Sequence, residues 1–249
     1  WASRAARAPR PVAAVVDLAN CNGCARCFAD CPYAAVTMQP RSDGKHLPRQ
    51  AVVDPDLCAG CGICAGACPS STPFRSVIAL ATGIDMPQAP IDALRIELEA
   101  ALARLALLPN GAPAILVFGC RGEDGDGALA RIADGRTAAI ALLCAAQLPP
   151  SFVEYALRAG ADGVLVTGCR DGDCVYRLGN RWTEERLAAL REPHLRAAVP
   201  RDRLRIAWTD RNDGQELLAA LGEFRRHLAA GSQARREAFA PPPKRTQSR

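Results

Sequence analysis

The chain lacks several features that would assign it to common functional classes. No apolar run among its 249 residues approaches the ~18 residues that a membrane-spanning helix needs. Aromatic residues make up only 5% of the sequence and form no stacking platform, and no glycine-rich phosphate-binding motif occurs. The sequence therefore predicts neither a nucleic-acid partner nor a dinucleotide or nucleotide-triphosphate site.

The chain also has few histidines and only a small net charge. His46, His194 and His227 lie far apart and beside no pattern that is typical of a catalytic triad or a metal site, so we expect none of them to act chemically. The formal charge of +5 comes from the two ends of the chain, where arginine and lysine are concentrated. The middle of the chain is net acidic, and no basic surface for nucleic acid is predicted.

Cysteine, by contrast, is abundant, and eight of the 12 cysteines fall into two copies of the spacing Cys-x2-Cys-x2-Cys-x3-Cys-Pro. Three thiolates at this spacing can surround three corners of an iron-sulfur cube, and in bacterial two-cluster ferredoxins the fourth cysteine of each run binds the other cluster. The predicted ligand sets are Cys21, Cys24, Cys27 and Cys68 for one [4Fe-4S] cluster and Cys58, Cys61, Cys64 and Cys31 for the other.

Two other uses of these cysteines are less consistent with the spacing. A structural zinc ion needs only four ligands and gives no role to the third closely spaced cysteine or to the Cys-Pro ending. A disulfide framework is typical of small secreted proteins, and this chain is longer than those. The motifs therefore indicate iron-sulfur clusters and an electron-transfer function.

The arrangement of apolar residues divides the chain into two folded domains. We expect an α+β ferredoxin domain at 12–82, a linker with an amphipathic helix at 83–112, and an α/β domain with a four-stranded, mainly parallel sheet at 113–231. The first domain has predicted strands at 13–16, 35–38, 51–53 and 77–81, and the linker helix spans 91–108. The second has predicted strands at 114–119, 138–143, 163–167 and 204–208 and helices at 127–134, 151–159, 183–195 and 214–230.

Both ends of the chain are basic. We expect 1–11 to be a basic linker or the end of a fragment, and 232–249 to be a disordered basic tail. Trp1 followed by Arg4 and Arg7 without any acidic residue also suits the cytoplasmic side of a membrane helix, so a missing membrane-embedded part before residue 1 is the alternative. The expected location is cytoplasmic, or the cytoplasmic face of a membrane under that alternative.

The remaining cysteines are placed at the ends of predicted strands. Cys120, Cys144 and Cys169 each follow a strand, and Cys174 lies further along the glycine-rich loop after Cys169. Because the carboxyl ends of parallel strands meet at one edge, where ligands bind in such sheets, we expect four thiols to converge there. They suit a [2Fe-2S] or a [4Fe-4S] cluster. Isolated buried cysteines, or a redox-active dithiol of Cys169 and Cys174, are the open alternatives.

The second domain resembles a known family. Residues 114–230, and above all the run from Gly160 to Asn180, are similar to the delta subunit of methyl-viologen-reducing hydrogenase, while residues 12–80 resemble bacterial two-cluster ferredoxins. The first resemblance implies a [2Fe-2S] cluster on Cys120, Cys144, Cys169 and Cys174. In that family the first strand usually ends in a Cys-x2-Cys pair, whereas Cys120 stands alone, so the ligand set around Cys120 stays open.

The resemblance also implies a function. It predicts an electron-transfer component of an oxidoreductase complex that relays single electrons between a hydrogenase, a formate dehydrogenase or a membrane cytochrome and a heterodisulfide-reductase-type flavoprotein. The flavin is expected on the partner. The alternatives are a disulfide reductase that uses Cys169 and Cys174 with electrons from the ferredoxin clusters, and an interaction scaffold whose second domain holds no metal.

Overall fold

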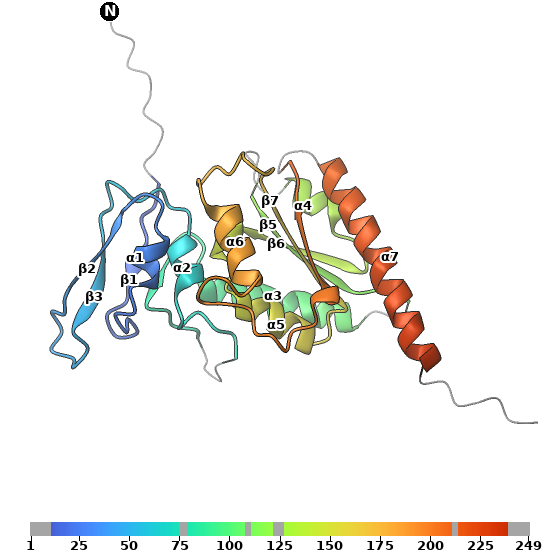
Figure 1. The fold of residues 1–249 in the computed structure, drawn as a ribbon, viewed down its shortest axis with the longest axis horizontal. Coiled ribbons are helices and arrows are strands. Elements are labelled where there is room, and N and C mark those ends of the chain that lie inside the picture. Colours follow the sequence, from blue (N-terminus) through green and yellow to red (C-terminus); the bar gives the residue numbers. More distant parts are fainter. Residues whose placement is uncertain (1–10, 75–78, 108–110, 122–126, 211–213, 239–249) are drawn as a thin grey trace, which may run out of the picture.

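The computed structural model of the chain describes residues 11–74, 79–107, 111–121, 127–210 and 214–238 (Figure 1). Its elements in chain order are β1 (Val15–Val16), α1 (Arg26–Asp30), β2 (Val36–Pro40), β3 (Arg49–Val53), α2 (Ile63–Ala67), β4 (Ile84–Asp85), α3 (Ile91–Ala106), β5 (Ile115–Cys120), α4 (Gly127–Ile132), β6 (Thr137–Leu142), η1 (Ala145–Gln147), α5 (Pro150–Arg158), β7 (Gly163–Gly168), α6 (Gly179–Leu187), η2 (Arg201–Arg203), β8 (Leu204–Trp208) and α7 (Gly214–Ala238).

The N-terminal part is a ferredoxin-like α+β unit with two small antiparallel sheets. β2 and β3 form a hairpin, and β1 pairs with β4 so that Val16 lies opposite Ile84. The strand predicted at 77–81 is wrong for 79–81, which form no strand, and 77–78 lie outside the described residues. The pairing falls later in the chain, directly after Gly83, which lies close to Cys21: a Cβ atom there would lie 3.0 Å from the Cys21 Cα atom.

The C-terminal part is built on a four-stranded sheet in the order β6-β5-β7-β8, and all of its pairings are parallel. We predicted a mainly parallel sheet, and it is wholly parallel. Residues of β5 and β7 are buried throughout, as expected for central strands that are covered on both faces. The strand order reverses between β5 and β7, and such a switch point is where open α/β sheets bind their ligands.

Helices cover both faces of this sheet (Figure 1). On one face Leu116 and Phe118 of β5 share a buried core with α3 and α5, and this core continues into the N-terminal part through Ile84 and Met86. On the other face Ile115 of β5 packs with α4 and α7. The helix α3 begins where the Asp85 carboxylate accepts a hydrogen bond from the Ile91 N–H at 3.1 Å. The core is therefore continuous between the two parts of the chain.

The ends of two helices differ most from the sequence prediction. Helix α6 begins at Gly179 and ends at Leu187, because Ala189 adopts a left-handed conformation (φ 65°) that stops it well before 195. Helix α7 continues to Ala238, so 232–238 are helical although we expected disorder, and 239–249 lie outside the described residues. Within the described ranges, no helix combines the length and the apolar character needed to cross a bilayer.

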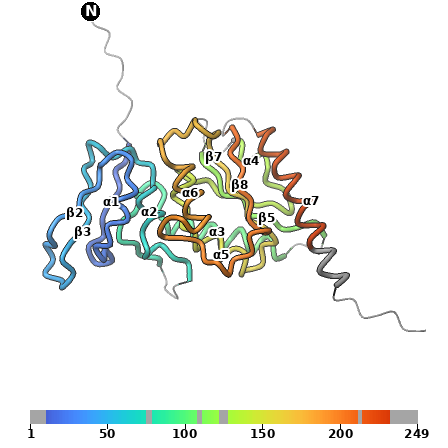
Figure 2. Tube along the Cα trace, viewed as in Figure 1, coloured from blue at the N-terminus to red at the C-terminus, as the bar shows by residue number. Residues whose placement is uncertain are grey.

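The two parts of the chain meet where α2 packs on η1. The β2–β3 hairpin and α7 lie at opposite ends of the long axis, with α2 and α6 between them (Figure 2). A Cβ atom on Gly66 of α2 would lie 2.2 Å from the carbonyl oxygen of Ala146 in η1. Only glycine allows this approach, which brings the second cysteine motif against the loop that follows Cys144.

A methyl group at Gly66 tests this contact. Alanine in place of glycine normally stabilises a helix by up to about 1 kcal/mol. We expect Gly66→Ala to lower the free energy of unfolding instead, by about 1–3 kcal/mol, because its methyl group collides with the Ala146 carbonyl. Gly135→Ala is the matched control, since a Cβ atom there meets nothing within 4 Å. Anaerobic thermal unfolding measures both variants, and equal midpoints would contradict the close contact.

Candidate metal centres

The eight cysteines of the two repeated motifs surround two small cavities. One, the first cysteine cavity, is lined by Cys21, Cys24, Cys27 and Cys68, and the other, the second cysteine cavity, by Cys31, Cys58, Cys61 and Cys64. Each motif thus gives three cysteines to one cavity and its fourth to the other. The structure brings together the residues of each predicted ligand set, and their binding of iron stays a prediction.

The chemistry of these two cavities fits iron-sulfur clusters. Each offers four thiols, which is the donor set of a [4Fe-4S] cluster. Backbone N–H groups point at sulfur: the Ala35 N–H donates to Cys31 Sγ at 3.3 Å, and the Ile63 N–H donates to Cys61. Such bonds stabilise thiolates, and their number tunes the potential of a bound cluster.

Burial opposes charge on these thiols when no metal compensates it. Burial raises the pKa of Cys27 to about 12 and that of Cys61 to about 11, with smaller contributions from neighbouring thiols. It raises the pKa of Cys64 well above its ordinary value. Cluster assembly must therefore remove protons from these cysteines, because thiolates are the ligands of iron.

The other four cysteines meet at the carboxyl edge of the sheet, and we call this group the sheet-edge site. The Cys120 thiol hydrogen-bonds to the thiols of Cys144 and Cys169. The Cys174 thiol hydrogen-bonds to the same two thiols. The thiols thus form a closed ring in which each sulfur contacts two others. These bonds raise the pKa of Cys144 and lower that of Cys120. None of the four is in a disulfide.

Backbone N–H groups also surround the sheet-edge site. Ala145 N–H donates to Cys120 Sγ at 3.0 Å, and the N–H groups of Ala146, Val175 and Tyr176 donate to Cys144, Cys169 and Cys174. Cys120, Cys144 and Cys169 are buried, and Cys174 is half-buried. Four thiols, three of them buried and each with a backbone donor, fit the ligand set of a single cluster.

Two glycines that sequence reasoning did not select shape this site. A Cβ atom on Gly179 would lie 2.2 Å from Cys144 Sγ and 3.1 Å from Cys174 Sγ, and one on Gly168 would lie 3.0 Å from Cys120 Sγ. Asn180 is buried, and its side-chain amide donates to the Cys169 carbonyl at 2.8 Å. The sequence contained a signal for both glycines, because Gly168 and Gly179 belong to the run from Gly160 to Asn180 that carries the family resemblance.

The second cysteine cavity adjoins the sheet-edge site. Cys61, Ile63, Cys144 and Trp182 belong to one buried cluster against which Tyr33 packs. Tyr33 lines the second cavity, and its pKa rises to about 12, chiefly through burial, then through the Cys61 thiol, with a smaller contribution from the Cys144 thiol. Cys27 of the first cavity neighbours Cys64 of the second, whereas none of the residues that line the first cavity belongs to the buried cluster shared with Cys144. The three cysteine groups are therefore arranged in series.

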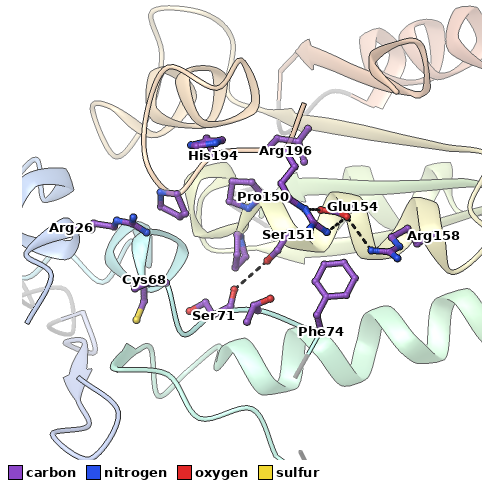
Figure 3. Close-up of a pocket in the computed structure, with 15 residues that line it drawn as sticks. Arg26, Cys68, Ser71, Phe74, Pro150, Ser151, Glu154, Arg158, His194 and Arg196 are labelled. Carbon is purple, nitrogen blue, oxygen red and sulfur yellow. Dashed lines mark hydrogen bonds and ion pairs between the residues drawn. The ribbon is translucent and has the colours of Figure 1, made fainter. Parts of the chain in front are cut away.

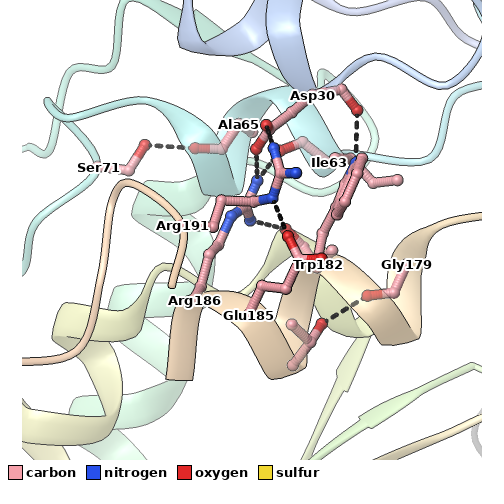
Figure 4. A network of polar contacts seen from close by, with 11 residues as sticks. Asp30, Ile63, Ala65, Ser71, Gly179, Trp182, Glu185, Arg186 and Arg191 are labelled. Atoms are coloured by element: carbon pink, nitrogen blue, oxygen red, sulfur yellow. Dashed lines mark hydrogen bonds and ion pairs between the residues drawn. The ribbon is translucent and has the colours of Figure 1, made fainter. Parts of the chain in front are cut away.

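A buried polar network connects the second cysteine cavity to the sheet-edge site (Figure 4). No pattern in the sequence predicts this network. Arg186 of α6 is only 1% exposed and forms an ion pair with Asp30, which directly precedes Cys31. Its guanidinium also donates to the Ala146 carbonyl at 2.7 Å and to the Ile63 carbonyl at 3.3 Å. Trp182 Nε1 donates to the Asp30 carbonyl at 3.0 Å. One side chain thus joins both cysteine motifs to the sheet-edge site.

A separate open cavity of about 520 Å³ lies beside the first cysteine cavity (Figure 3). Cys68 lies at one end of it, and Phe74 lies at the other, near Glu154 with its ion-paired Arg158 and Arg196. Because it contains only one of the cysteines, this cavity is not a candidate cluster site.

Comparisons with known proteins agree with this division of the chain. Residues 130–230 match the family described as "Methyl-viologen-reducing hydrogenase, delta subunit", and residues 20–72 match the 4Fe-4S dicluster domain. The first match begins after Cys120, so the place of Cys120 in the sheet-edge site rests on its geometry. Both resemblances drawn from the sequence are confirmed by these matches.

Individual relatives cover parts of the chain. It is 33% identical over 81 residues to an iron-sulfur subunit of the F420-non-reducing hydrogenase of Archaeoglobus profundus, covering 32% of this chain and 59% of that protein. It is 29% identical over 85 residues to the vhc iron-sulfur subunit of the same hydrogenase type in Methanococcus voltae, covering 34% and 59%.

A third relative is much longer than this chain. This relative is one of the subunits of the ferredoxin:CoB-CoM heterodisulfide reductase of Methanosarcina mazei, and it is 36% identical over 102 residues, which are 39% of this chain and 13% of that protein. The chain therefore spans under two thirds of the length of each of these relatives.

Gly179 provides a test of the sheet-edge site. We expect Gly179→Ala to prevent metal binding there, because its Cβ atom would lie 2.2 Å from Cys144 Sγ. Iron bound by the N-terminal cysteines should be unchanged. Gly222→Ala is the control, since its Cβ atom would be 3.7 Å from the nearest side chain. Iron analysis and EPR spectroscopy after anaerobic purification compare the two variants. A Gly179→Ala protein with the iron content of the wild type would contradict a metal site at the sheet edge.

Proposed function

We propose that the chain is an electron-transfer subunit that binds two [4Fe-4S] clusters in its N-terminal part and one [2Fe-2S] cluster at the sheet-edge site. It passes single electrons between a hydrogenase, a formate dehydrogenase or a membrane cytochrome and a heterodisulfide-reductase-type flavoprotein. The observation that carries the proposal is the series of three four-cysteine groups, with the second cavity and the sheet-edge site in one buried cluster. The names of the relatives support the class of complex.

Each cysteine group has a distinct task in this proposal. Iron-sulfur clusters, when bound, accept and release one electron at a time. The first cavity includes Cys24, which is exposed, so this end of the series offers one place for electron exchange with a partner. The buried cluster of Ile63 and Trp182 excludes water between the second cavity and Cys144. At the other end Cys174 is half-buried and its loop is exposed, which provides a second place for exchange.

A disulfide reductase is the second candidate, because the Cys169 and Cys174 thiols contact each other. The same contact is one of four in the closed ring that includes Cys120 and Cys144. A dithiol needs only two of these cysteines, whereas a cluster uses all four. The ring favours the cluster.

Metal content decides between the candidates. Anaerobic iron and sulfide analysis should give about ten irons per chain, and a reductive EPR titration should give a [2Fe-2S] signal besides those of [4Fe-4S] clusters. The expectation follows from two four-thiol cavities and one four-thiol ring. About eight irons without a [2Fe-2S] signal would contradict the third cluster.

Single replacements in the ring separate the two candidates further. Cys144→Ala and Cys174→Ala should each abolish the [2Fe-2S] signal and leave about eight irons, because each removes one of four ligands. Under the disulfide-reductase alternative only Cys174→Ala, and not Cys144→Ala, would abolish reduction of a model disulfide. A Cys144→Ala protein that keeps the [2Fe-2S] signal would contradict our ligand set.

A further inference from the structure

Arg186 lies at the boundary between two candidate clusters. Its guanidinium donates to the carbonyl of Ile63, which lines the second cysteine cavity, and to the carbonyl of Ala146, two residues after Cys144. Its ion-pair partner Asp30 directly precedes Cys31, which also lines the second cavity. The charged group thus touches the backbone of both cysteine sites.

The cost of burying this arginine indicates a role beyond packing. Arg186 is 1% exposed, and its Nε finds no hydrogen-bond partner among the described residues. Desolvating a charge is expensive, and apolar residues of similar volume often stabilise a protein as well as a buried ion pair does. Burial lowers the pKa of Arg186, and a guanidinium still stays protonated in proteins.

The charged groups around Arg186 form a small network, which also includes the nearby Cys144 thiol and, beyond Glu185, its second partner Arg181 at 2.8 Å. Asp30 accepts from Arg186 and, through its other oxygen, from Arg191 at 2.7 Å. Arg191 also pairs with Glu185 at 2.7 Å and lies over the Trp182 ring, 3.4 Å from its centre. Removing Arg186 and removing Asp30 therefore change the charge beside the two sites by one unit in opposite directions.

We propose that Arg186 is a positioning residue that holds the second cysteine cavity against the sheet-edge site and, with Asp30, sets the relative reduction potentials of the clusters bound there. This inference rests on the proposed function. A reduced cluster carries one more negative charge than an oxidised one. A nearby guanidinium therefore stabilises the reduced state and raises the potential, and a carboxylate lowers it.

The test uses variants that change the charge in opposite directions. Arg186→Met removes the positive charge, Asp30→Asn removes the negative charge with little change of shape, and Arg186→Lys keeps the positive charge. Arg205→Met is the control, because Arg205 lies on edge strand β8 and is half exposed. Each loaded protein is titrated anaerobically, and the midpoint potential of each cluster is read from its EPR signal.

We expect Arg186→Met to lower the midpoints of the sheet-edge cluster and the second-cavity cluster, and Asp30→Asn to raise them. Arg186→Lys and Arg205→Met should keep wild-type values. The first-cavity cluster should shift least, because none of the residues that Arg186 contacts lines that cavity. Should Arg186→Met fail to fold, the upward shift in Asp30→Asn carries the test.

Two results would overturn the inference. Unchanged midpoints in fully loaded Arg186→Met and Asp30→Asn would show that these charges do not act on the clusters. Shifts of the same sign in both would indicate general loosening instead of electrostatics. Failure of the proposed function appears differently, as a wild-type protein without the [2Fe-2S] signal. In that case the second-cavity cluster alone still tests the inference, since Arg186 contacts Ile63 of that cavity.

Discussion

The close contact of α2 with η1 is the constraint on which the arrangement of the three cysteine groups depends. Cys64 lies within α2, and η1 follows Cys144 directly, so this contact fixes one cysteine group against another. It requires glycine at Gly66, because any side chain would meet the Ala146 carbonyl. Electron transfer requires that redox centres lie close together. Here the backbone contact between α2 and η1 keeps two cysteine groups close.

The buried Asp30–Arg186 ion pair lies beside the contact between α2 and η1, and burying its two charges has an energetic cost. Breaking a buried ion pair by removing one partner typically costs about 3–5 kcal/mol, because the other charge is left uncompensated. Here the second arginine, Arg191, also binds Asp30 and limits that penalty. The pair is thus better explained by orientation and local charge than by stability. Arg177 adds a lesser contact, donating to the Pro32 carbonyl at 3.0 Å.

Much of the fold and of the sites could be predicted from the sequence, and the reasons are local. Strand ends at Cys120, Cys144 and Cys169 follow from short apolar runs, and the parallel topology then places their thiols at one edge. The crossing of Cys31 and Cys68 between the cavities follows from the spacing of the motifs.

What could not be predicted depends on contacts between distant segments. Asp30 and Arg186 are separated by most of the chain, and nothing near either residue indicates that they pair. Helix α6 begins at Gly179, which lies against the Cys144 and Cys174 sulfurs, and a helical pattern in the sequence does not report that contact. The strand at Ile84 depends on pairing with Val16, whereas the run before it is equally apolar.

The central claim is that the second cysteine cavity and the sheet-edge site hold neighbouring clusters on either side of one buried core. The most direct measurement is the spin relaxation of the [2Fe-2S] EPR signal in the partly and the fully reduced protein. We predict faster relaxation once the neighbouring [4Fe-4S] cluster is also reduced, because two paramagnets at short distance interact. A [2Fe-2S] signal whose relaxation is the same in both states would contradict the account.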